Sequence, residues 1–189
     1  MHCAIAGHSR RTALPLLVIL AIGSGCTERP TPSRVVPPAT LALIDSTTHL
    51  DKAAREPMLV EHPSGTLFVS GYWEPTPTLW RSVDRGATWR RVDVGPPQRG
   101  AIGNSDVDLA VAPDGTLYFV TMLFDRPKLE GASINIAVSK DTGATWTWTQ
   151  LSTSRFDDRP WVEVAPDGTA HVIWNDLDGV AHSVSRTEG

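Results

Sequence analysis

Three charged residues recur at one position of a repeated sequence pattern, and they are the foremost candidates for chemistry. They stand nine residues before the glycines of three similar turns, and they are Glu56, Asp106 and Arg159. Equivalent positions in a repeat protein occupy equivalent places, so we expect the three side chains to converge. The planar guanidinium of Arg159 could then hold a ligand carboxylate or a neighbouring acid. Alternatively, these charges only solvate the ends of strands or pair with each other.

Aromatic and polar side chains gather beside these positions and in the segments that follow the turns. Sugars stack their C–H faces on aromatic rings, and their hydroxyl groups need hydrogen bonds to polar side chains. These segments supply the remaining binding candidates: Arg55, Trp73, Glu74, Asp125, Arg126, Asp157, Trp174 and Asn175. For Trp73 and Trp174, packing between neighbouring repeats is the alternative interpretation.

Other patterns for catalysis or metal binding are weak. Two Asp-x-Asp pairs do not continue as a calcium loop, and His171 and His182 lack the spacing of metal ligands. The chain has no Gly-rich phosphate loop, no Gly-x-Ser-x-Gly motif and no cysteine cluster. The sequence therefore predicts neither a metal nor a cofactor.

The elements that must position the candidates form three copies of one unit, at 56–70, 106–120 and 159–173. In each copy an apolar-rich stretch runs into Pro-x-Gly, which is followed by Thr and a second apolar run. Proline, then Asp or Ser, then glycine forms a tight turn because glycine adopts positive φ at low cost. Each copy is therefore predicted to be a β-hairpin.

A second motif, Ser-x-Asp-x-Gly-x-Thr-Trp, follows the first two hairpins, at 82–89 and at 139–146. An Asp in a turn accepts backbone N–H groups a few residues ahead, and the Trp indole can cover the turn. We therefore expect a scaffold role for the motif residues, which are Ser82, Asp84, Gly86, Trp89, Ser139, Asp141, Gly143 and Trp146. A third, imperfect copy at 185–189 has Thr where the Asp belongs.

This motif, twice at the period of the hairpins, resembles the Asp-box of sialidase-like (BNR-repeat) β-propellers. The resemblance covers residues 55–189 and implies an all-β fold, a partial β-propeller of about three four-stranded antiparallel blades. It also implies boxes between the third and fourth strands, on the face opposite the ligand site. Propellers close with roughly 4–8 blades. We therefore expect the first part of a six- or seven-bladed propeller that is incomplete at its C-terminus; pairing with a second copy is the alternative.

The resemblance implies glycoside hydrolysis only in part. Sialidases need three arginines for the substrate carboxylate, a Tyr–Glu nucleophile pair and an Asp acid/base. Their aromatic-Arg-aliphatic-Pro motif is absent here, and 124–127 and 156–161 are only partial echoes of it. Asp158 and Arg159 are the best catalytic candidates that remain. Asp-boxes also occur in other glycosidases, sorting receptors and photosystem assembly factors, so the box defines no activity.

Three hypotheses about function follow. The first is an exported propeller that binds a glycan or an envelope protein without chemistry. The second is an exo-acting glycoside hydrolase of sialidase type, whose catalytic set would be completed by further C-terminal blades. The third is a structural module in envelope assembly.

The first segment is typical of a targeting signal. Arg10 and Arg11 precede an apolar run at 13–22, and about ten apolar residues are too few to span a bilayer. Small residues and Cys26 follow, as in a bacterial lipoprotein signal, although Gly23 stands where that signal prefers an aliphatic residue. The alternative is an ordinary cleaved signal with an incidental cysteine.

The predicted organisation has three parts. They are a lipoprotein signal peptide at 1–25, a lipidated Cys26 with a Pro/Thr-rich tether at 26–40, and the Asp-box blades at 41–189. We expect an exported protein, lipid-anchored to the bacterial cell envelope, that meets the membrane only through this anchor. The formal net charge of −4 gives no reason to expect a nucleic-acid partner. The composition, 41% hydrophobic and 20% charged, excludes a coiled coil and a wholly disordered chain.

Overall fold

The computed structural model describes residues 47–73 and 76–185. Cys26, Glu74 and most of the imperfect third box lie outside the described residues, so the predictions made for them stay predictions. Within the described ranges, no helix is long and apolar enough to cross a membrane.

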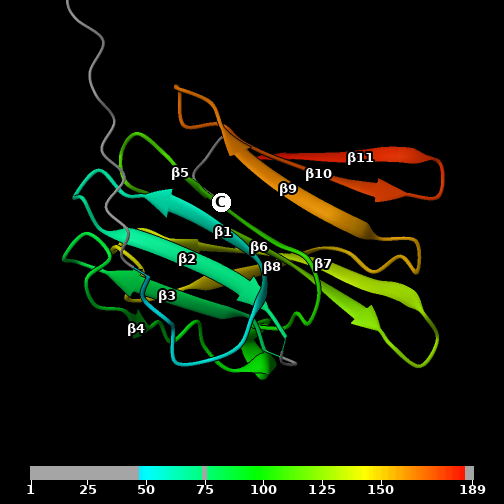
Figure 1. Cartoon of the computed structure of the whole chain (residues 1–189). Helices are drawn as coiled ribbons and strands as arrows, with labels where there is room; N and C mark the ends of the chain where they lie inside the picture. Colours follow the sequence, from blue (N-terminus) through cyan, green and yellow to red (C-terminus); the bar gives the residue numbers. More distant parts are fainter. Residues whose placement is uncertain (1–46, 74–75, 186–189) are drawn as a thin grey trace, which may run out of the picture. The chain divides into compact units, whose positions relative to one another are not determined.

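The described chain is built from antiparallel strands in three sheets, with one short 3₁₀ turn at Pro97–Arg99 (Figure 1). The first sheet comprises β1 (Arg55–Glu61), β2 (Leu67–Tyr72), β3 (Thr78–Ser82) and β4 (Arg90–Arg91). The second comprises β5 (Val107–Val111), β6 (Leu117–Asp125), β7 (Glu130–Ser139) and β8 (Thr147–Ser152). The third comprises β9 (Asp158–Val164), β10 (Ala170–Asp176) and β11 (Gly179–Ser185).

Each sheet is a meander in which consecutive strands pair. The first two sheets have four strands, as expected for propeller blades, and the described part of the third has three. The predicted hairpins are confirmed at β1–β2, β5–β6 and β9–β10. Their turn glycines, Gly65, Gly115 and Gly168, all have positive φ, and each donates its N–H to the carbonyl three residues earlier.

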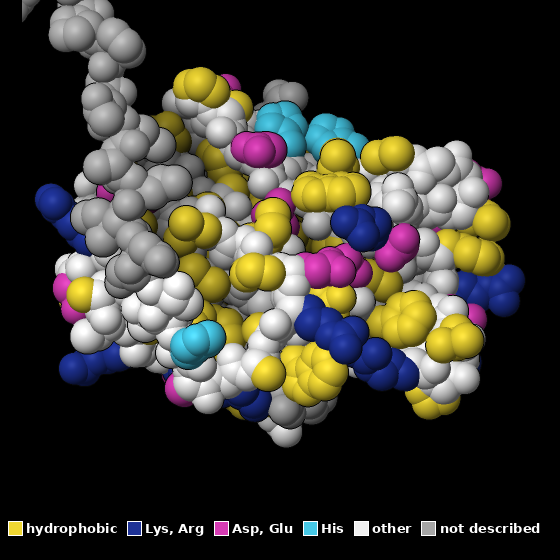
Figure 2. All heavy atoms as spheres, in the orientation of Figure 1, with side chains coloured by type: hydrophobic (Ala, Val, Ile, Leu, Met, Phe, Trp, Pro, Cys, Tyr) yellow, Lys and Arg dark blue, Asp and Glu magenta, His cyan; other side chains and the backbone are white. Residues whose placement is uncertain are grey.

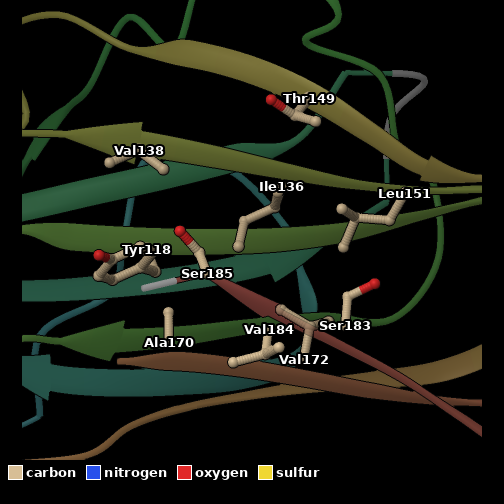
Figure 3. Close-up of a pocket in the computed structure, with 10 residues that line it drawn as sticks. All are labelled: Tyr118, Ile136, Val138, Thr149, Leu151, Ala170, Val172, Ser183, Val184 and Ser185. Carbon is tan, nitrogen blue, oxygen red and sulfur yellow. The ribbon is translucent and has the colours of Figure 1, made fainter. Parts of the chain in front are cut away.

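The second sheet is covered on both faces. Because side chains alternate along each strand, successive residues of one strand enter two different cores. Leu117 and Phe119 of β6 point into one core with Phe68 and Leu79 of the first sheet. Tyr118 and the next alternate residues of β6 point into a second core with the third sheet. Figure 3 shows part of this second interface, where side chains from β6, β7 and β8 lie beside those of β10 and β11.

The first, inner strands of the three sheets lie next to one another, since β1 contacts β5 and β5 contacts β9. The three sheets therefore follow one another in sequence order. This arrangement, with one meander per sheet and the first strand innermost, is that of consecutive propeller blades. The prediction of an all-β partial propeller is therefore correct.

The two box turns, at 82–89 and 139–146, connect the third strand of a sheet to the fourth, as predicted. The Asp84 carboxylate accepts the Thr88 backbone N–H at 2.8 Å and the Thr88 and Ser82 hydroxyls. The Trp89 indole N–H donates to the Gly86 carbonyl at 3.0 Å. The second turn repeats this pattern around Asp141 with distances that differ by at most 0.2 Å. The Ser, Asp and Trp side chains of each box therefore bond within their own turn, as a scaffold role requires.

The strand register places the boxes and the charged repeat positions at opposite ends of the sheets. Ser82 pairs with Leu67, beside the β1–β2 turn, whereas Tyr72 pairs with Arg55 at the far end of the same strands. We call these the box end and the rim end.

Candidate functional site

The rim end gathers residues from all three sheets into one cluster. Its members are Glu56 and Tyr72 of the first sheet, Asp106 just before β5, and Arg159 of β9, and we call them the rim cluster. Figure 2 shows acidic and basic side chains next to one another among hydrophobic ones on one face of the molecule.

Arg159 and Asp106 form a loose ion pair. The guanidinium Nη1 lies 3.9 Å from the Asp106 Oδ1, and the Arg159 side chain is 53% exposed. The same guanidinium lies 5.6 Å from the centre of the Trp161 ring. At these distances the guanidinium keeps donors free for a ligand, while the acid and the ring hold it in place.

Tyr72 links the first sheet to this pair. Its hydroxyl donates to the Glu56 carboxylate at 3.1 Å. Burial raises the pKa of Tyr72, and the hydrogen bond and charge of Glu56 and the charge of Asp106 raise it further, against the opposing effect of Arg55. Tyr72 is therefore held as a neutral hydroxyl between two carboxylates.

The backbone at Glu56 and Arg159 explains why these side chains point to the rim. Both residues have positive φ, +46° and +48°, which costs a non-glycine residue about 1–2 kcal/mol. The pairing of β1 with β2 breaks its register between Arg55 and Met58, and that of β9 with β10 breaks at the matching place. Such bulges re-aim a side chain and recur next to functional sites.

Two exposed tryptophans flank the rim cluster. Trp73 is 47% exposed, and the Arg55 guanidinium lies 4.3 Å from its ring centre. Trp161 is 41% exposed. Large exposed aromatic rings beside hydrogen-bonding groups are the composition that a sugar-binding surface requires.

Below the rim, the inner strands line a hollow of about 490 Å³. Asp108 is its most deeply placed acid, and it joins two sheets by accepting the N–H of Leu109 at 2.8 Å and of Val162 at 2.9 Å. Burial raises the pKa of the Asp108 carboxyl, and these two hydrogen bonds oppose that rise. Asp108 therefore holds β9 against β5, directly below Arg159 and Asp106.

A second hollow, of about 520 Å³, opens between the β6–β7 hairpin and the segment before β9. Arg155 lies over the Phe156 ring at 4.6 Å on its wall. Asp158, a predicted catalytic residue, is exposed and lines this hollow, so it faces a different space from that of its neighbour Arg159.

Two predicted binding residues are buried. Asp157 is 1% exposed, and its carboxylate accepts the Ser152 hydroxyl at 2.8 Å and the Ser154 N–H at 2.9 Å. Trp174 is 6% exposed and packs in the core between the second and third sheets. The Asp157 carboxylate is bonded within the connection between β8 and β9, and Asp157 also lines the second hollow. Trp174 packs between two sheets, as the packing alternative describes.

The remaining candidates lie beside the rim cluster rather than in it. Asp125 pairs with Lys128 at 2.8 Å, and Lys128 lowers the pKa of the Asp125 carboxyl. Arg126 donates to the Asn104 carbonyl at 3.1 Å. Asn175 stands opposite Asp158 in the pairing of β10 with β9.

Sequence reasoning placed the segment that begins at Tyr72 at the rim but chose only Trp73 and Glu74 from it, and it did not choose Trp161. Tyr72 is the last residue of β2, and its register with Arg55 is the signal that could have singled it out. Trp161 stands seven residues before its turn glycine, where the other two copies have Met58 and Asp108. Among residues 47–73 and 76–185, no group of three His, Cys, Asp or Glu side chains is arranged to hold a metal ion.

Comparisons with known proteins support the fold alone. No protein-family model matches the chain, and no curated protein matches it in sequence. Its fold is similar to that of an α-L-arabinofuranosidase from Fusarium graminearum, with a TM-score of 0.56 and 17% identity over 69% of this chain and 44% of that one. An α-L-arabinanase from Penicillium chrysogenum gives 0.56 and 20%, over 69% and 45% of the two chains.

A protein of unknown function from Dyadobacter fermentans gives a TM-score of 0.57 and 16% identity, over 76% of this chain and 50% of that one. The chain thus spans about half the length of these three structures. The glycosidases among them are β-propellers, which agrees with three consecutive blades in this chain.

Proposed function

We propose that the rim end is a glycan-binding surface on a propeller of glycosidase-like fold. The observation that carries this proposal is Arg159, whose exposed guanidinium lies between the Asp106 carboxylate and the Trp161 ring. A sugar that stacks on the Trp161 face would bring its hydroxyl or carboxylate groups within reach of the guanidinium. Tyr72 and Glu56 supply further hydrogen-bonding groups.

The test is a glycan array followed by titration calorimetry, with arabino-oligosaccharides and sialyllactose as probes. Trp161→Ala should weaken binding by at least tenfold, because it removes the stacking face. Val83→Ala is the matched control, since Val83 is an exposed apolar residue at the box end. Binding that both variants retain, or an array without any ligand, would overturn the proposal.

Glycoside hydrolysis is a second candidate function, favoured by the Tyr72–Glu56 hydrogen bond beside a second carboxylate, Asp106. Glycosidases act through paired acids near the scissile bond. Release of sugar from arabino-oligosaccharides or sialyllactose should then disappear in Glu56→Gln and persist in Glu61→Gln, which changes an exposed acid at the other end of β1. Asp158→Asn tests the other predicted acid in the same assay. Binding without any hydrolysis by the wild type would leave the first function alone.

We also propose export and lipidation at Cys26, which rests on the sequence pattern at 13–26. Labelled fatty acid should enter the protein when it is expressed in a bacterium that processes lipoproteins. The label should be lost in Cys26→Ser and kept in Cys3→Ser. Equal labelling of the two variants would contradict lipidation at Cys26.

A further inference from the structure

Two histidines that are eleven residues apart in the sequence lie next to each other on the third sheet. The rings of His171 and His182 are parallel within 9°, and their centres are 5.3 Å apart. His171 Nδ1 lies 3.1 Å from His182 Nε2. Eleven residues separate them in sequence, which is why their spacing suggested no metal site.

The register of the β10–β11 hairpin creates this pair. Ile173 stands opposite His182, and His171 stands opposite Val184, so the two histidines are diagonal neighbours on one face. Val172 and Trp174, the alternate residues of β10, point into the core on the other face. The histidines therefore project outward from two strands whose pairing is fixed by a tight turn, Asp176 to Gly179.

The two nitrogens form a hydrogen bond, which a metal ion would have to replace. They are 3.1 Å apart and the ring centres are 5.3 Å apart, so the nitrogens face each other and share one proton. Metal–nitrogen bonds to histidine are about 2.0–2.1 Å long, so both rings would have to turn out of the hydrogen bond to direct their lone pairs at one ion. His182 is exposed and His171 is half-buried on the outer face of the sheet, which leaves room for this rotation.

We propose that His171 and His182 form a two-histidine site for a divalent transition metal ion of the class that prefers imidazole, Cu²⁺, Ni²⁺ or Zn²⁺. Two acids supply negative charge nearby. Glu163 stands opposite His171 in the pairing of β10 with β9, and the charges of Asp167 and His171 interact. Among the described residues no third side chain is grouped with the pair, so water would complete the coordination.

The test is calorimetric titration of the untagged full chain with Cu²⁺ and, separately, Zn²⁺, in a buffer that does not chelate metals. His2, Cys3, His8 and Cys26 can also bind these ions, so the site is counted by difference: the wild type should bind one equivalent more than the His171→Gln variant, with Cu²⁺ tighter than Zn²⁺. His171→Gln and His182→Gln should each weaken metal binding at this site at least tenfold. The double variant should bind the metal about as weakly as either single variant, because one remaining histidine cannot chelate the ion. His49→Gln, an exposed single histidine, is the matched control and should bind as the wild type does.

A second measurement separates metal binding from a structural role of the pair. A metal held by both strands stabilises the folded state, so Zn²⁺ should raise the melting temperature of the wild type and of His49→Gln. It should not raise that of either site variant, whatever their melting temperatures without metal. No saturable binding by the wild type, or equal binding and equal thermal shifts in all variants, would overturn the proposal.

Discussion

At the box end and at the rim end, the same kinds of side chain make different contacts. The carboxylates of Asp84 and Asp141 are filled by hydrogen bonds from their own turns, and the indoles of Trp89 and Trp146 are tied to backbone carbonyls. At the rim, Asp106 meets Arg159 at 3.9 Å and accepts the Ser105 hydroxyl at 3.0 Å. The rings of Trp161 and Trp73 are 41% and 47% exposed, each with a guanidinium over one face. Groups whose bonds are filled within their own turn stabilise the fold, whereas exposed groups held by longer contacts are accessible to a ligand.

The pKa values follow the same division. Hydrogen bonds from the Thr88 and Thr145 side chains and N–H groups lower the pKa of Asp84 and Asp141 to about 2. Burial raises the pKa of Asp108, which joins β9 to β5, and of Asp157, which bonds within the segment between β8 and β9. Where hydrogen bonds stabilise the charged carboxylate, the residue closes a turn. Where burial destabilises the charged carboxylate, the residue joins neighbouring segments of the chain.

Replacing Asp108 should cause the largest loss of stability, because its carboxylate accepts hydrogen bonds from two backbone N–H groups. Asp108→Ala leaves the N–H groups of Leu109 and Val162 buried without an acceptor, and we expect the free energy of unfolding to fall by about 3 kcal/mol. Chemical denaturation of the full chain measures this. A loss below about 1 kcal/mol would show that water replaces the carboxylate and that the inner strands do not need it.

A smaller loss of stability is expected at the box end. Asp141→Ala removes the acceptor for the Thr145 N–H and hydroxyl, so the melting temperature should fall by several degrees while rim-end glycan binding persists. Asp178→Ala, an exposed turn residue, is the control and should melt as the wild type does. If Asp141→Ala abolished binding in a folded protein, the two ends would not be independent.

Arg159→Lys should change binding and leave the melting temperature unaltered. Lysine keeps the charge but loses the planar fork, so glycan affinity should fall by about tenfold, as loss of one charge-assisted hydrogen bond does. Arg90→Lys, on the exposed outer strand β4, is the matched control. A variant that melts lower and binds normally would make Arg159 a scaffold residue.

The smallest effect is on the acid dependence of stability. The lowered pKa values of Asp84 and Asp141 contribute stability that is complete above about pH 4, near the unfolded pKa, and is lost as the pH falls towards 2. The raised pKa of Asp108 acts oppositely, since its protonation favours the folded state as the pH falls. Between pH 4 and 2, unfolding free energy should therefore decline less steeply in Asp84→Asn/Asp141→Asn than in the wild type. Parallel curves would contradict this.

Sequence alone predicted the parts of the fold that local chemistry determines. Pro-x-Gly marks the β1–β2 turn and its two counterparts, and the repeated Ser-x-Asp-x-Gly-x-Thr-Trp motif places Asp84 and Asp141 in turns between strands. Because equal spacing means equal position in a repeat, the convergence of Asp106 and Arg159 could also be expected.

The remaining features depend on contacts between strands that the sequence does not display. The burial of Asp157 follows from the β8–β9 connection folding back on Gly131, whose N–H donates to the Arg155 carbonyl. The contact of His171 with His182 follows from a hairpin register that one residue of slip would abolish. Both depend on how strands align, which composition and spacing leave open.

The short reach of the box-turn bonds bears on the order of folding. The bonds that close the second box turn join residues at most four apart, whereas the Asp108–Val162 bond joins residues 54 apart. Local bonds cost little chain entropy to form, so these turns can close before distant sheets meet. The rim draws on three sheets and is completed only when all of them have docked. Its binding surface would therefore exist only in a fully assembled core, and ligand binding would report that assembly is complete.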